Sequence, residues 1–390
     1  MLYFIIANSV FFAIANKSTK RKAALRRYGL VMKRLFLLLA ALMILPLIIG
    51  CTTKPGESNV SQNQSEAVSN TTSKEESKEE SMAPTNYVDT IERHPTTIVK
   101  QSDNNYVITT ELYGGTYKRT FYKRSWGTWN IGGMAFKPAT GAEIEFVSAS
   151  TDWEYVFRAG QTAATQPFAG GNHDNEKMID IAFYNGVTGE KLNLDDKKPV
   201  TVDLLKIVEN TAIYFDKQPD NVFANVERIY YYAGKSIYNE CNYEIVQDTH
   251  FSLSYTAMFP INKDYGTRIV YHLGNGKTKE WTSSKVGKAD YSGPMDKNNA
   301  ALEVDIFGHK DPRYIFNVKV HTKADSTGNF GNGSKTFYWD MNAGQNKLYF
   351  SRFPDTGATL VKKGAKWNTL TSWSFNYDEN NTYTEPEESK

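Results

Sequence analysis

The fold is indicated most clearly by residues 153–158, which read Trp-Glu-Tyr-Val-Phe-Arg, and by residues 179–184, which read Ile-Asp-Ile-Ala-Phe-Tyr. In both stretches large apolar residues alternate with polar or smaller ones. A period of two residues is typical of a β-strand with one buried face and one wet face. The sequence here therefore predicts two half-buried strands joined by a long loop.

Strand-like runs recur from about Tyr87 to Tyr377, where Tyr, Trp, Phe, Val and Ile are frequent. The further runs span residues 106–112, 116–122, 142–147, 212–215, 226–233, 250–259, 267–273, 302–307, 314–321, 335–340, 347–353 and 370–377. Convincing helical periodicity is absent, although residues 202–210 are compatible with a short helix. Many short strands between turn signals predict an all-β antiparallel β-sandwich, with residues 87–377 in a single large domain. Asn275-Gly276 and Asn332-Gly333 are typical hairpin turns.

The loop between the two quoted stretches is unusually rich in reactive side chains. Arg158 ends the first stretch, and Asn172, His173, Asp174 and Glu176 follow the Gly170-Gly171 pair. Long loops without secondary structure are often functional, and paired glycines favour a tightly turned, ordered backbone. We therefore interpret this loop as the best candidate site. The alternative is a structural loop, because Asn and Asp are also good turn residues.

Alternation within the strands also predicts which residues share a face. Within residues 226–232, one face of the predicted strand carries Arg228, Tyr230 and Tyr232. Within residues 267–273, one face of a second predicted strand carries Arg268 and His272. If these strands are neighbours, one sheet surface carries cations and aromatic rings. Aromatic rings stack on sugars and Arg binds carboxylates bidentately, so this surface is predicted to bind a polysaccharide. The alternative is the ordinary polar face of an antiparallel sheet.

The amino-terminal part has the pattern of a secretion signal. Lys33-Arg34 is a basic start, residues 35–49 are apolar, and Ile48-Ile49-Gly50-Cys51 closes the segment. This pattern resembles the lipobox of bacterial lipoproteins. The resemblance implies that residues 32–51 are a signal peptide, that Cys51 is lipidated, and that the protein is anchored to the extracellular face of the cell membrane. Residues 1–31 are then interpreted as an over-extended start; an uncleaved membrane anchor is the alternative.

Between the signal and the predicted domain, residues 52–86 are mostly Ser, Glu, Lys, Asn, Gln and Thr. Such a composition predicts a disordered tether, because it cannot bury enough apolar surface to order itself. The acidic residues 378–390 are predicted to be a disordered tail. If Cys51 carries lipid, Cys241 has no cysteine partner, and a packed thiol is the favoured interpretation.

A lipoprotein signal, a tether and a large β domain rich in Tyr, Trp and Asn together resemble the concanavalin-like jelly-roll proteins that act on polysaccharides. The resemblance covers architecture, and the carboxylate motif of jelly-roll glycoside hydrolases is absent. It implies a polysaccharide lyase that cleaves a uronate-containing glycan by β-elimination. Arg158 and Asn172 would neutralise the uronate carboxylate, His173 would be the base, and Glu176 would orient His173 or pair with Arg158. The acid would be Tyr184, Tyr230 or Tyr255.

Other functions remain open at this point. Asp174 with Glu176, or Glu176 with Glu154, are candidate carboxylates of a glycoside hydrolase. A non-catalytic carbohydrate-binding or adhesive lipoprotein is a further alternative. No metal-binding motif is present, although a structural Ca²⁺ would suit a protein this rich in Asp and Asn. Nucleic acid is not an expected partner, because the net charge of +2 includes the basic first 34 residues and no dense basic stripe follows.

Overall fold

The computed structural model describes residues 87–148, 152–283, 289–294, 301–321, 335–341, 344–353 and 357–383. The predicted signal peptide, the lipidated Cys51, the tether, the Asn332-Gly333 turn and the end of the acidic tail lie outside these residues. Within the described part of the chain, no helix is long and apolar enough to cross a membrane.

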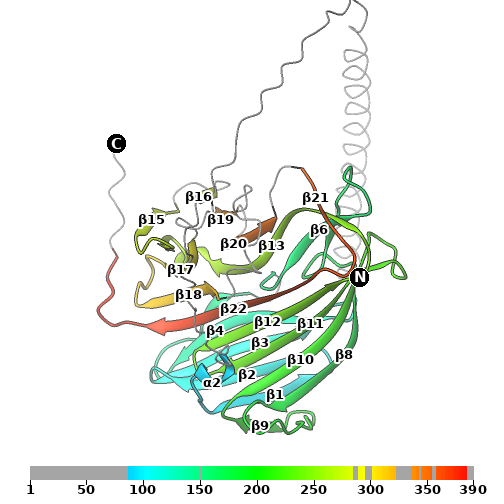
Figure 1. Cartoon of the computed structure of the whole chain (residues 1–390). Helices are drawn as coiled ribbons and strands as arrows, with labels where there is room; N and C mark the ends of the chain where they lie inside the picture. Colours follow the sequence, from blue (N-terminus) through cyan, green and yellow to red (C-terminus); the bar gives the residue numbers. More distant parts are fainter. Residues whose placement is uncertain are drawn as a thin grey trace, which may run out of the picture. The chain divides into compact units, whose positions relative to one another are not determined.

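Three antiparallel sheets make up the described part of the protein (Figure 1). The six-stranded sheet has the order β5 (Ile144–Val147), β4 (Trp129–Pro138), β3 (Gly115–Lys123), β2 (Asn105–Leu112), β1 (Thr96–Ser102) and β9 (Pro199–Val202). The nine-stranded sheet has the order β15 (Thr278–Thr282), β14 (Arg268–Leu273), β17 (Ala301–Phe307), β18 (Tyr314–Val320), β22 (Lys366–Tyr377), β12 (Ser236–Ile245), β11 (Val222–Ala233), β10 (Leu205–Tyr214) and β8 (Glu176–Asn185).

The third sheet, with seven strands, has the order β16 (Ala289–Pro294), β19 (Lys335–Asp340), β20 (Gln345–Phe353), β13 (Thr249–Asn262), β6 (Val156–Gly160) and β7 (Phe168–Ala169). Its remaining strand, β21 (Thr359–Val361), pairs with the start of β13. Two short helical turns complete the elements, α2 (Tyr87–Thr90) and η1 (Lys263–Tyr265).

The nine-stranded sheet forms one layer, and the other two sheets pack against it. In the larger core cluster, Ile108 of β2 and Phe259 of β13 belong to the same group of buried residues as Trp373 of β22. In the smaller cluster, Phe157 of β6 and Phe251 of β13 meet Tyr243 of β12. Strand β5 of the six-stranded sheet also contacts β13, so the two smaller sheets adjoin. The architecture is a sandwich with one continuous layer and one divided layer.

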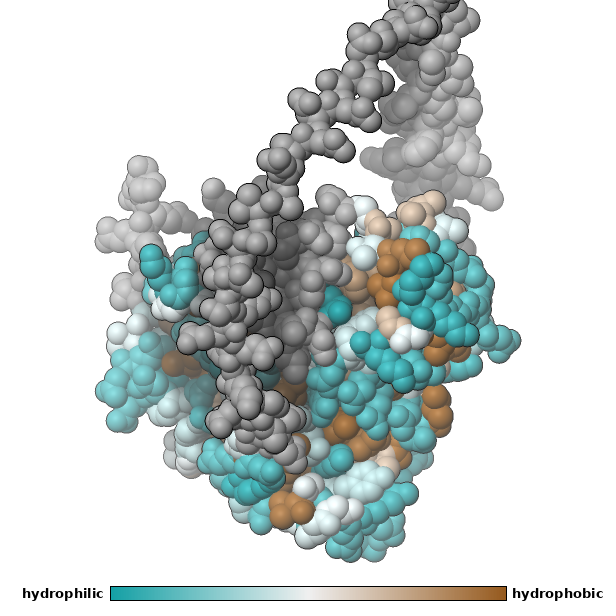
Figure 2. Space-filling view, viewed as in Figure 1, coloured by the Kyte–Doolittle hydropathy of each residue, from teal (hydrophilic) through white to brown (hydrophobic). Residues whose placement is uncertain are grey.

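Aromatic rings fill much of the space between the layers. Phe146 on β5 is fully buried, and its ring centroid lies 4.8 Å from Phe316, 5.3 Å from Tyr314 and 5.5 Å from Phe375. These three partners belong to β18 and β22 of the nine-stranded sheet. Offset and edge-on ring pairs of this kind add stability beyond the burial of area. The outside of the described protein, in contrast, is mostly hydrophilic with scattered apolar patches in the view of Figure 2.

The predicted all-β antiparallel sandwich is confirmed. The short helix considered for residues 202–210 is wrong, because most of this segment forms β10, which is paired on both sides by β8 and β11. The Asn275-Gly276 turn does connect β14 to β15, with Gly276 at a φ of 78°. The sequence does not predict strands β1, β4, β7, β9, β12, β15, β16 and β21. Of the two longest of these, β4 contains two glycines and β12 alternates around polar residues.

Replacing Phe146 by Ala should lower the free energy of unfolding by about 3–5 kcal/mol, because the removed ring joins two sheets and leaves a cavity. Chemical denaturation followed by tryptophan fluorescence measures this change. Ile179→Ala is the matched control, since Ile179 is 59% exposed and its truncation should change the free energy by less than about 0.5 kcal/mol. Equal effects of the two substitutions would contradict this description of the core.

Candidate functional site

The loop that links β7 to β8 is ordered by an unusual backbone. Gly170 and Gly171 have φ values of 83° and 57°, and Asp174 and Asn175 have φ values of 65° and 56°. A Cβ atom on Gly171 would lie 2.9 Å from the carbonyl oxygen of Tyr155 and 3.0 Å from Asp152 Oδ1. The paired glycines are therefore required both by their left-handed conformation and by close approach to the neighbouring segment. The loop is tightly turned, as the sequence predicts.

Asp152 is the centre of the polar contacts made by this loop. Its Oδ1 accepts a short hydrogen bond from the backbone N–H of Asn172. Its Oδ2 lies 3.0 Å from Lys347 Nζ on β20 and 3.8 Å from His173 Nε2. We call Asp152, Asn172, His173 and Lys347 the Asp152 cluster. Because its members come from three separate segments, the cluster holds the loop against the seven-stranded sheet.

The aromatic ring of Phe168 brings Arg158 and His173 together. The imidazole of His173 stacks on Phe168 with 4.4 Å between ring centroids and 19° between planes. The guanidinium carbon of Arg158 lies 5.4 Å from the centroid of the same ring, and Arg158 Nε donates to the carbonyl of Gln166 at 3.1 Å. Arg158 and His173 therefore both contact the ring of Phe168. Figure 1 locates β6, which carries Arg158, beside β13.

The same face of the seven-stranded sheet carries a group of aromatic residues. Phe337 on β19 stacks on Tyr349 on β20 at 4.6 Å, and Tyr255 on β13 lies 4.7 Å from Tyr349. Residues on this face alternate with the core residues Tyr338, Leu348 and Phe350, so they point away from the nine-stranded sheet. We call Phe168, Tyr255, Phe337, Trp339 and Tyr349 the aromatic face. Phe168 and Trp339 are 36% and 38% exposed.

Lys347 links the aromatic face to the Asp152 cluster. Its Nζ lies 5.4 Å from the ring centroid of Tyr349, within the range of a cation–π contact. Burial lowers the pKa of Lys347, and the attraction of Asp152 opposes this shift. Burial also lowers the pKa of His173 below its usual value of 6.5, with Lys347 acting in the same direction and Asp152 in the opposite one. His173 is therefore neutral at pH 7 and is able to accept a proton.

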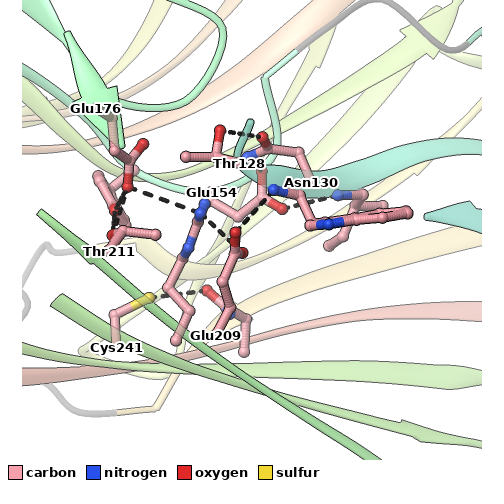
Figure 3. A network of polar contacts seen from close by, with 12 residues as sticks. Thr128, Asn130, Glu154, Glu176, Glu209, Thr211 and Cys241 are labelled. Atoms are coloured by element: carbon pink, nitrogen blue, oxygen red, sulfur yellow. Dashed lines mark hydrogen bonds and ion pairs between the residues drawn. The ribbon is translucent and has the colours of Figure 1, made fainter. Parts of the chain in front are cut away.

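A second polar network lies entirely in the interior. Figure 3 shows Glu154, Glu176 and Glu209 directed toward one region between the sheets. Arg228 is the buried cation that pairs with Glu176 and Glu209. Arg228 Nη2 lies 2.8 Å from Glu209 Oε2 and 3.7 Å from Glu176 Oε1. Glu209 accepts the backbone N–H of Trp129 at 2.8 Å. The three carboxylates and the guanidinium are at most 1% exposed, so this network does not contact a soluble substrate.

The remaining contacts of the network explain its position. Glu154 accepts hydrogen bonds from the Ile131 N–H at 2.8 Å and from the Tyr230 hydroxyl at 3.1 Å. Glu176 accepts from the Tyr155 hydroxyl at 2.5 Å and from Thr211 at 2.7 Å. Cys241 is buried beside the network, and burial raises the pKa of its thiol to about 12. The thiol is therefore a packed, unreactive group, as the sequence indicates.

Several predicted site residues are thus placed in the core. Arg228, Tyr230 and Tyr232 are fully buried, so the prediction that they line a solvent-facing sugar surface is wrong. Their shared face is correct, but it is the face that packs between the layers. Glu176 is also fully buried, and its carboxylate contacts Tyr155, Thr211 and Arg228. It therefore neither orients His173 nor pairs with Arg158, and it cannot serve as an exposed glycosidase carboxylate.

Other predicted residues lie far from the loop. Tyr184 is eight residues beyond Glu176 on the extended strand β8, which is about 26 Å at the usual rise per residue. It is therefore too distant to act together with His173. Arg268 and His272 do point outward from β14, where His272 Nε2 lies 2.7 Å from Asp305 and Arg268 is paired with Glu280. They form no common surface with Arg228, Tyr230 and Tyr232.

The residues that sequence reasoning missed are Asp152, Phe168 and Lys347 with the aromatic residues of β19 and β20. Alternation along residues 335–340 places Phe337 and Trp339 on the same face of their strand. Alternation along residues 347–353 does the same for Lys347 and Tyr349. What the sequence does not give is the pairing of β19 and β20 with β13 and β6, far away along the chain. Among the described residues, no group of three or more His, Cys, Asp or Glu side chains is arranged to hold a metal ion.

The buried network should make stability depend on pH. Burial raises the pKa of Glu209 from 4.5 to about 8, more than the nearby Arg228 lowers it. The folded protein then holds a proton that the unfolded chain releases, so the free energy of unfolding should fall as the pH rises from about 4.5 to about 8. Glu209→Gln mimics the neutral acid and should lose most of this slope. Urea unfolding at several pH values across this range measures how the free energy of unfolding changes with pH. Glu227→Gln, on the outer face of β11, is the control and should keep the pH dependence of the unmodified protein.

Comparisons with known proteins add structural likeness alone. No family model and no curated protein matches the sequence. Solved structures to which the chain is similar include the galactosidase domain of an alpha-galactosidase-sucrose kinase, at 7% identity and a TM-score of 0.44, over 72% of this chain and 42% of that chain. A GH36 alpha-galactosidase from Geobacillus stearothermophilus is 7% identical, with a TM-score of 0.43 over 72% of this chain and 41% of that chain. A putative mutarotase from Salmonella typhimurium is 9% identical, with a TM-score of 0.36 over 75% of this chain and 99% of that chain. This chain spans less than half the length of the two galactosidase chains.

Proposed function

We propose that the protein is a carbohydrate-active protein that binds a glycan across the aromatic face of the seven-stranded sheet. The observation that carries this proposal is a continuous chain of side-chain contacts that joins the loop to the aromatic face. Its members, in order of contact, are Arg158, Phe168, His173, Asp152, Lys347 and Tyr349. Aromatic rings offer flat apolar surfaces to the faces of sugar rings. The charged side chains among them supply hydrogen bonds to hydroxyl and carboxylate groups.

The charges of the site favour an acidic sugar. Arg158 and Lys347 are cations, Asp152 is an anion, and His173 is neutral at pH 7 because its pKa is lowered by burial. These four residues therefore carry one excess positive charge. A uronate carboxylate would meet complementary charge here, which supports the uronate-containing glycan predicted from the sequence.

Catalysis is a second candidate function, and it is supported by the contact between His173 and Asp152. A neutral imidazole next to a carboxylate is suited to take up a proton and to hold it. In a lyase, His173 would remove a proton from the uronate, and Tyr255 or Tyr349 would be the proton donor in place of the remote Tyr184. In a hydrolase, a second carboxylate would have to join Asp152. Glu154 and Glu176 do not fill that role, because both are buried.

The test combines binding with two product assays. Affinity electrophoresis in gels that contain pectate or alginate should retard the protein. Phe168→Ala should weaken binding about two- to tenfold, because an aromatic contact contributes about 0.5–1.5 kcal/mol beyond area burial. Tyr184→Ala is the matched control and should bind normally. An absence of retardation by every acidic polysaccharide, or equal binding by the Phe168 and Tyr184 variants, would overturn the proposed glycan site.

The product assays separate the candidate activities. Unsaturated uronate, detected by ultraviolet absorbance and lost in His173→Ala, would establish a lyase. New reducing ends without that absorbance would establish a hydrolase, and binding without either product would establish a binding protein. If His173 is the base, its lowered pKa predicts that activity persists to a pH below 6.5 and falls only under more acidic conditions. The positive charge of Lys347 is one cause of the lowered pKa of His173. Lys347→Met removes this charge, so the pKa of His173 should rise and the loss of activity in acid should begin at a higher pH.

We also propose that the protein is anchored outside the cell membrane by lipid on Cys51. The proposal is supported by the signal-like residues 32–51 in the sequence. In a bacterial expression host, Cys51→Ser should move the protein from the membrane fraction to the soluble fraction and should abolish labelling by a radioactive fatty acid. Cys241→Ser is the control, since its thiol is buried in the core and its replacement should leave labelling intact. Continued labelling of the Cys51 variant would reject the anchor.

A further inference from the structure

The outer face of the nine-stranded sheet holds a shallow groove of about 540 Å³ that the proposed function does not use. The groove crosses β8, β10, β11, β12 and β22. Its lining includes four amides, two carboxylates and one ammonium group: Asn210, Asn225, Asn242, Asn368, Glu227, Glu244 and Lys366. This volume lies within the range of about 300–1,000 Å³ that is usual for ligand sites.

Side chains in and beside the groove form a ladder of two hydrogen-bonded groups, one on β8 and β10 and the other on β11, β12 and β22. The strand register aligns one residue from each strand, so that each lies directly opposite the next on the neighbouring strand: Asp180, Asn210, Glu227, Asn242 and Asn368. Asn210 Nδ2 donates to Asp180 at 2.8 Å, Asn242 Nδ2 donates to Glu227 at 3.0 Å, and Asn368 Nδ2 donates to Asn242 at 2.8 Å. The ladder therefore fixes the orientation of the amides before any ligand binds.

The ladder leaves hydrogen-bonding capacity that faces the groove. An Asn side chain has two N–H donors and a carbonyl with two lone pairs. Asn210 and Asn242 each donate one hydrogen bond within the ladder, whereas Asn368 donates both to Asn242 and, at 2.8 Å, to Glu240. Asn225 lies in the neighbouring row, opposite Ala212 on one side and Glu244 on the other. Its side chain is exposed and forms no hydrogen bond with the other described residues that line the groove. A ligand rich in hydroxyl groups would find donors and acceptors in alternation along the row.

The spacing and charge of the row identify the kind of ligand. Neighbouring strands are about 4.8 Å apart, so five strands present polar groups at regular intervals over about 19 Å. This repeat is close to the length of one sugar unit in a polysaccharide. Glu227 and Glu244 outnumber Lys366, so the groove repels polyanions, and a neutral chain fits it better than a uronate chain.

We infer that this groove is a second glycan-binding site, which takes a neutral polysaccharide running across the strands. It is independent of the aromatic face, because it lies on the outer face of the other layer of the sandwich. Its ligand class also differs, since Arg158, Asp152, His173 and Lys347 together carry one excess positive charge and this groove carries excess negative charge.

Affinity electrophoresis with a soluble β-glucan, a mannan and an arabinoxylan tests the inference. At least one of these neutral polysaccharides should retard the protein, and pectate should not compete for this binding. Asn225→Ala and Asn242→Ala should each weaken retardation several-fold, and the double variant about tenfold or more, because each loses hydrogen bonds to the ligand. Asn225 is exposed, so its replacement should leave the fold intact even if Asn242→Ala does not.

Two controls distinguish this site from the first one. Asn317→Ala removes an outward amide of the same sheet that bonds Glu303 and Asp305 on β17, outside the groove, and it should bind neutral glycans normally. Phe168→Ala should impair binding to pectate while leaving binding to the neutral polysaccharide unchanged. Failure of all three neutral polysaccharides to retard the protein, or normal binding by the Asn225 variant, would overturn the inference whatever the result with acidic glycans.

Discussion

The buried guanidinium of Arg228 connects the layers of the sandwich. It is paired with Glu209 of β10 and approaches Glu176 of β8, while the network around it reaches Trp129, Asn130 and Ile131 of β4 through Glu209 and Glu154. The nine-stranded sheet, the six-stranded sheet and the segment just before β6 thus contribute to one polar cluster. A charge in such surroundings is costly unless it is paired, so loss of one partner would leave another uncompensated. Burial raises the pKa of Glu209 to about 8, so this network also links the stability of the fold to pH.

This interior network also supports the candidate site on the surface. Glu154 and Tyr155 are anchored in the network, and Asp152 precedes them by two and three residues. A Cβ on Gly170 would lie 2.9 Å from the ring of Tyr155, so the loop can approach only because this position is a glycine. The position of Asp152, and through it those of His173 and Lys347, therefore depends on groups that never contact solvent. A site supported in this way is held rigid before its ligand arrives, which lowers the entropic cost of binding.

Sequence reasoning was sufficient for the fold class and for the unusual loop, because both depend on local patterns. Alternation correctly grouped Arg228 with Tyr230 and Tyr232, but it did not reveal which face was inside. Both faces of that strand carry aromatic residues, with Ile229 and Tyr231 on the other, so hydrophobicity alone does not orient it. Glu154, Glu176 and Glu209 resemble ordinary surface carboxylates in the sequence, since charged residues are almost never fully buried unless they are paired. The pairing depends on contacts between distant strands, and no local pattern encodes it.

The same distinction between local pattern and long-range pairing separates the two proposed glycan surfaces from the core. Along β11, Val226 and Arg228 face inward while Asn225 and Glu227 face outward; along β20, Leu348 and Phe350 face inward while Lys347 and Tyr349 face outward. Successive residues of one strand therefore serve the core and a surface independently. Substitutions on the outer faces can change charge and hydrogen bonding without removing a core contact. A cationic aromatic face and an acidic amide groove are thus compatible with a single sandwich, because strand geometry keeps their side chains apart from the packing that stabilises it.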